Sequence, residues 1–85
     1  MRYYIAAFRS RNQTMVFSQI LSSYNIKNRI INTPRMATVS CGLSVRFEEK
    51  DLSYVRQVLA RRNFSGFAGL FMVVQNGVNQ VVSKV

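Results

Sequence analysis

Histidine and tryptophan are absent from this 85-residue chain, and cysteine and proline each occur once. Without histidine, nucleophilic catalysis by a Ser-His-Asp triad or a Cys-His pair is excluded. The same absence argues against a zinc site, which needs three or four His, Cys or carboxylate ligands. A metal bound by oxygen ligands would have to use Glu48, Glu49 and Asp51. We interpret these acids as charges at the start of a helix instead, and we expect no metal or other cofactor.

A single cysteine cannot form a disulfide within the chain. Secreted domains of this length usually carry several disulfides, so the sequence predicts a cytoplasmic protein with a reduced thiol. No apolar run approaches the roughly 18–20 residues that span a bilayer, so no membrane helix is expected. The length predicts one domain over residues 1–85.

Acidic residues are the other scarce group. Three Asp and Glu face twelve Lys and Arg, which gives a formal net charge of +9. Such a charge attracts anions in general, including nucleic acid, acidic proteins, phosphates and small anionic sulfur or selenium species. The net charge alone does not choose among these partners.

The first half of the chain predicts a strand, a helix and a second strand. Residues 3–8 are rich in aromatic and other β-forming side chains. Ser10 can cap a helix, with Gln13 as its capping-box partner, and apolar residues at helical spacing follow over residues 11–24. Residues 27–32 alternate polar and apolar side chains and predict the next strand.

The second half begins with Thr33-Pro34, which favours a short helical turn over residues 34–38. Residues 42–47 alternate with a period of two and predict a third strand. The acidic cluster that follows predicts a second helix near residues 50–62.

Two further strands are expected at the C-terminus. Asn76-Gly77 separates two β-like runs and predicts a hairpin with a type I′ turn. The resulting order predicts an α+β fold of the ferredoxin-like split βαβ type, βαββαβ, with two helices on one face of an antiparallel sheet and an added C-terminal strand.

Cys41 is the one candidate for covalent chemistry. Its thiolate is the nucleophilic form, and nearby positive charge favours that form. Gly42 lacks a Cβ, so a bulky group could approach the sulfur closely. Free cysteine is also among the most buried residue types, so a purely structural Cys41 is the alternative. The neighbours that could support a thiolate or a bound anion are Arg35, Thr38, Ser40, Gly42 and Arg46.

The run Thr33-Pro34-Arg35 followed by Ser40-Cys41-Gly42 resembles the signature of a small bacterial family, the selenium/sulfur carrier-like proteins. The resemblance covers roughly residues 3–74. It implies that Cys41 holds selenium or sulfur as a selenopersulfide or persulfide and passes it to another protein, a carrier more than an enzyme. Its partners would then be donor and acceptor proteins, and the unusually basic chain points to acidic ones.

Two rival functions are consistent with the sequence. A basic domain with aromatics in residues 3–8 and 66–71 could bind nucleic acid, although the second motif is not on the third strand, where RNA-recognition modules place it. The valine-rich C-terminal hairpin could also pair with another chain and form a homodimer.

Overall fold

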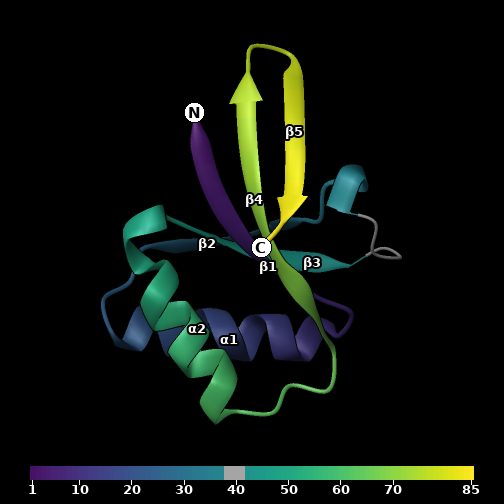
Figure 1. Cartoon of the computed structure of the whole chain (residues 1–85). Coiled ribbons are helices and arrows are strands. Elements are labelled where there is room, and N and C mark those ends of the chain that lie inside the picture. Colours follow the sequence, from purple (N-terminus) through teal and green to yellow (C-terminus); the bar gives the residue numbers. More distant parts are fainter. Residues whose placement is uncertain (38–41) are drawn as a thin grey trace.

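The computed structural model describes residues 1–37 and 42–85 (Figure 1). In chain order the elements are β1 (Arg2–Phe8), α1 (Arg11–Ser23), β2 (Asn28–Asn32), the 3₁₀ turn η1 (Arg35–Ala37), β3 (Leu43–Phe47), the 3₁₀ turn η2 (Glu49–Asp51), α2 (Leu52–Arg61), β4 (Phe67–Asn76) and β5 (Asn79–Lys84). The predicted helices and strands are confirmed to within a few residues.

In the described ranges, five strands form one sheet in the order β2-β3-β1-β4-β5. Every neighbouring pair is antiparallel. β1 therefore lies in the middle, and both β2 and β5 are edge strands. Among the same residues, no helix is long and apolar enough to cross a membrane.

Helix α1 begins as the sequence predicts, with one difference at its cap. The Ser10 side chain accepts a hydrogen bond from the Gln13 backbone N–H at 3.2 Å. The Gln13 side chain donates to Ser65 and accepts from the Gly66 backbone N–H, and this pairing anchors the loop before β4. Gln13 therefore links two segments that are far apart in sequence.

The acidic cluster lies before α2, as expected, but its two glutamates form ion pairs instead of capping the helix. Neither Glu48 nor Asp51 caps the helix with its side chain. Glu49 pairs with Arg2 at 3.0 Å and Glu48 pairs with Lys50 at 3.7 Å, all on exposed side chains. These surface pairs each stabilise the fold by no more than about 1 kcal/mol.

The C-terminal hairpin is confirmed, but its turn differs from the prediction. Asn76 pairs with Asn79, so the two loop residues are Gly77 and Val78. Of these two residues, only Gly77 has a positive φ, of 60°, whereas a type I′ turn needs a positive φ at both. A single positive φ at the first loop position matches a type II′ turn. The predicted turn type was therefore wrong, and the turn lies one residue later in the chain than predicted.

Both faces of the sheet bury apolar side chains. The helices pack on one face, where Phe8 meets Phe17 at 5.3 Å between ring centroids. In the described residues, neither α1 nor α2 covers the opposite face, yet it holds a second cluster around Ile5, which is fully buried. That second cluster contains Tyr3, Ile5, Ala7, Ala37, Phe71 and Val73.

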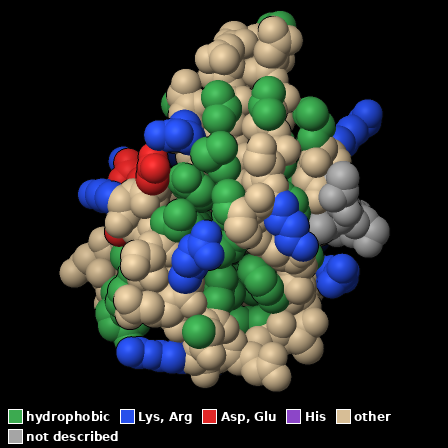
Figure 2. Space-filling model, in the orientation of Figure 1, with side chains coloured by type: hydrophobic (Ala, Val, Ile, Leu, Met, Phe, Trp, Pro, Cys, Tyr) green, Lys and Arg blue, Asp and Glu red, His purple; other side chains and the backbone are tan. Residues whose placement is uncertain are grey.

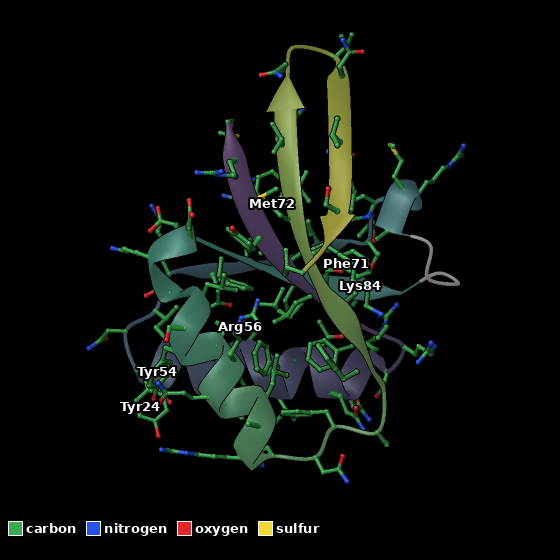
Figure 3. The ribbon with its side chains drawn as sticks, viewed as in Figure 1. Tyr24, Tyr54, Arg56, Phe71, Met72 and Lys84 are labelled. Carbon is green, nitrogen blue, oxygen red and sulfur yellow. The ribbon has the colours of Figure 1, made fainter. Side chains whose placement is uncertain are left out.

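Figure 2 shows hydrophobic side chains on the visible face between α2 and the β4–β5 hairpin. In Figure 3, Arg56 lies on the α2 side of this area and Lys84 on the β5 side. Some Lys and Arg side chains lie in the middle of this face beside the hydrophobic ones and others lie at its edges, while the acidic side chains gather on one side.

Candidate functional site

The segment that joins β2 to β3 carries the predicted site. Thr38, Ser40 and Cys41 lie outside the described residues. The residues on either side of them are described, and they form a well-defined frame. This frame consists of Thr33, the turn η1, Gly42 and Ser44.

Thr33 connects the two ends of this segment. Its backbone N–H donates to the Gly42 carbonyl at 3.1 Å, directly beyond the last paired residues of β2 and β3. Its hydroxyl oxygen lies 2.7 Å from the Ser44 hydroxyl oxygen, which is fully buried. Both bonds hold Thr33 beside Gly42 and the start of β3.

Gly42 occupies a position that only glycine can fill. Its φ is +147°, a backbone conformation that side chains with a Cβ rarely adopt. A Cβ at this position would lie 2.5 Å from the Phe8 carbonyl oxygen. Glycine is thus required at position 42 for the close approach of this residue to the end of β1.

The turn η1 packs against the face of the sheet opposite α1 and α2. The Ala37 N–H donates to the Pro34 carbonyl at 3.0 Å, and Ala37 is fully buried in the second apolar cluster. The turn also lies against β5. Ala37 therefore anchors the turn on the sheet, while Arg35 and Met36 are exposed.

The two predicted cationic supports are at different places in the fold. Arg35 is in η1, within the frame, and its side chain is exposed. Arg46 lies near the other end of β3, roughly 13 Å along the strand from Gly42 at about 3.3 Å per residue. Its guanidinium stacks over the Tyr3 ring at 3.8 Å from the ring centroid. Of the two predicted cationic supports, Arg35 therefore lies within the frame and Arg46 does not.

The aromatic side chains that suggested nucleic-acid binding lie in the sheet, and all but the half-buried Phe67 are buried. Tyr3 and Tyr4 are each 6% exposed and Phe71 is 4% exposed, so none offers a free ring face for stacking. A more accessible aromatic pair lies at the end of α1 and on α2, where the exposed Tyr24 packs edge-on against the half-buried Tyr54 at 5.2 Å between ring centroids (Figure 3). Desolvation and a hydrogen bond with Tyr24 raise the pKa of Tyr54 above its ordinary value.

The sequence did not reveal the contribution of Thr33, Ser44 and Phe8 to this frame. Thr33 suggested only a helix cap, and Ser44 only the polar side of a half-exposed strand. The one available signal was the glycine at position 42, directly before a strand, which is typical of a close backbone approach. The partner in that approach, Phe8, is far away in sequence.

Comparison with known protein families agrees with this location. The family described as "Putative Se/S carrier protein-like" matches residues 3–66, from β1 to the loop before β4. The chain belongs to this family. The match includes Thr33-Pro34-Arg35 and Ser40-Cys41-Gly42, the residues on which the resemblance was based. No curated protein and no solved structure matches the chain.

Proposed function

We propose that the chain is a cytoplasmic carrier that holds selenium or sulfur on Cys41 and delivers it to an acceptor protein. The observation that carries the proposal is the family match across residues 3–66. The frame around Cys41 supports it, because Thr33 and Gly42 bring the flanks of the cysteine together at the end of the sheet. Reactive residues are often presented this way, on a loop held by a rigid scaffold.

Loading would occur by exchange at the thiolate of Cys41. The thiolate attacks the outer sulfur of a donor persulfide, R–S–S⁻, a new S–S bond forms on Cys41, and the donor leaves as R–S⁻. The outer atom keeps its oxidation state, so no external oxidant or reductant is consumed. A selenopersulfide donor, R–S–Se⁻, transfers selenium in the same way. In the delivery step an acceptor thiolate attacks the outer atom and forms a bond to it, and Cys41 leaves as its thiolate.

Arg35 supports the thiolate in this proposal by its charge. It is an exposed cation within the frame and forms no ion pair in the described part of the chain. Thr38, Ser40 and the backbone at Gly42 would contribute hydrogen bonds to the anion. The excess of cations, twelve against three acids, favours acidic donor and acceptor proteins.

We also propose that the fold is of the ferredoxin-like type. The interleaved order β2-β3-β1-β4, with each strand antiparallel to its neighbours, supports the ferredoxin-like plan, with β5 as the addition at the edge.

Intact-mass spectrometry tests the carrier directly. The native protein is incubated with a small persulfide or selenopersulfide donor, and a gain of one sulfur or selenium atom that a thiol reductant removes is expected. Cys41→Ser should show no gain. Labelling by a small alkylating agent is followed in parallel near neutral pH. If Cys41 labels only after the protein is denatured, the carrier proposal fails.

A further inference from the structure

A basic pocket lies at the opposite end of the sheet from the Cys41 segment. It has a volume of about 380 Å³, and its lining includes Arg2, Tyr3, Lys27, Arg29, Arg46 and Glu48. β1 and β2 begin at this end and β3 ends there, so the sheet topology brings the cations together from three strands and the loop before β2. Pockets of roughly 300–1,000 Å³ are the usual size for small-molecule sites.

Most of the positive charge in this pocket is not neutralised by the protein. In the described part of the chain, which contains all three acidic residues, ion pairs join Arg2 to Glu49 and Lys50 to Glu48. No ion pair involves Lys27, Arg29 or Arg46 in that part of the chain. The pocket therefore presents at least three unpaired cations to one small volume.

Two of these cations are placed in direct opposition. Arg29 on β2 and Arg46 on β3 are register partners, so their side chains leave the sheet on the same face. Like charges directly opposite each other on neighbouring strands destabilise a sheet. Neither residue is needed to fill the core, because Arg29 is exposed and Arg46 is half-buried. A bound anion between them would remove the repulsion.

Arg46 is also held in place before any ligand arrives. Its guanidinium carbon lies over the Tyr3 ring, 3.8 Å from the ring centroid, and among the described residues its Nη2 donates a weak hydrogen bond to the Met1 sulfur at 3.6 Å. An aromatic stack fixes the plane of a guanidinium and leaves its edge N–H groups free. Those groups form the planar pair of donors that suits a phosphate or carboxylate.

We propose that this pocket binds the phosphate group of a small phosphorylated molecule. A phosphate carries close to two negative charges and three acceptor oxygens, which matches several unpaired cations better than a single carboxylate does. Single-stranded nucleic acid fits less well, because it needs free aromatic faces along a groove, and Tyr3 is covered by Arg46. The pocket is a second site, separate from Cys41.

The test is a titration of the whole chain with glycerol 3-phosphate and inorganic phosphate at low salt, followed by calorimetry and by amide NMR shifts. Saturable binding is expected, with the shifts confined to the residues that line the pocket. Arg46→Gln and Arg29→Gln should each weaken binding by about tenfold or more. Arg56→Gln removes the same charge from the exposed surface of α2, outside the pocket, and should weaken binding by less than about twofold.

Three results would overturn the proposal. The first is no saturable binding. The second is an equal loss of affinity in Arg56→Gln and Arg29→Gln, which would assign the effect to net charge. The third is much tighter binding of a single-stranded octanucleotide of RNA through the same residues, which would assign the pocket to nucleic acid. Arg29→Gln keeps the test decisive even if Arg46→Gln loosens Tyr3, because the Arg29 side chain is exposed. Thiol labelling is a separate readout, so the carrier and the pocket can fail independently.

Discussion

Arg29 and Arg46 lie directly opposite each other on β2 and β3, with their side chains on one face of the sheet and no carboxylate paired with either in the described structure. Such an arrangement costs stability in the unliganded protein. We expect Arg29→Thr to raise the free energy of unfolding by about 0.2–1 kcal/mol at low salt. Urea denaturation measures it, and added salt should shrink the gain. Arg56→Gln, with the same loss of charge, is the control, and an equal gain there would contradict the local explanation.

Gly42→Ala should be strongly destabilising. The added Cβ would lie 2.5 Å from the Phe8 carbonyl oxygen, and φ at this residue is +147°. Backbone strain and the steric clash together predict a loss of about 2–4 kcal/mol in the free energy of unfolding. Gly77→Ala is the matched control, since φ there is +60° and nothing lies within 4 Å of its Cβ, so about 1 kcal/mol is expected. Equal losses in the two variants would contradict the close approach of residue 42 to β1.

The Thr33–Ser44 hydroxyl pair should behave as a coupled unit. Thr33→Val keeps the shape of the side chain but leaves the buried Ser44 hydroxyl without this partner, at a cost of about 1–3 kcal/mol. The double variant with Ser44→Ala should lose less stability than the sum of the two single variants. Denaturation of all four proteins completes the cycle. Additive losses would mean that the hydroxyl pair contributes no coupling energy.

Arg35→Gln should slow alkylation of Cys41 near neutral pH, by about two- to fivefold, as expected for the loss of one exposed charge near a thiolate. The pH at which the rate reaches half its maximum should rise, because fewer thiolates form at a given pH without the cation. Arg56→Gln on α2 is the matched control for net charge. Identical rate profiles for the wild-type chain and Arg35→Gln would remove Arg35 from the proposed site.

Self-association through the C-terminal hairpin stays a prediction. β5 is an edge strand, and Val78 and Val81 are 99% and 57% exposed. Pairing of two such edges should strengthen with added salt, because each chain carries a net charge of +9. Val81→Lys should then abolish the association seen by light scattering. A monomeric mass at high micromolar concentration for the wild-type chain would contradict the prediction.

Local patterns identified the elements because each depends on neighbours in sequence. Ser10 and the apolar spacing after it predicted the start and face of α1, and the alternation in residues 42–47 predicted β3. The hairpin turn was misplaced because Asn76 extends β4 and pairs with Asn79, and such pairing depends on the register of both strands. The prediction of a type I′ turn was based on the Asn-Gly pair alone.

By itself, the sequence determined the class of the fold, the single thiol and the family signature around it, since these depend on residue identity and local periodicity. Only the tertiary structure decided which residues meet. It placed the Phe8 carbonyl against Gly42 and the Thr33 hydroxyl against Ser44. It also placed Arg46 over Tyr3, at the opposite end of β3 from Gly42. The reason is that sheet order and register bring distant segments together, and neither can be read from any one segment.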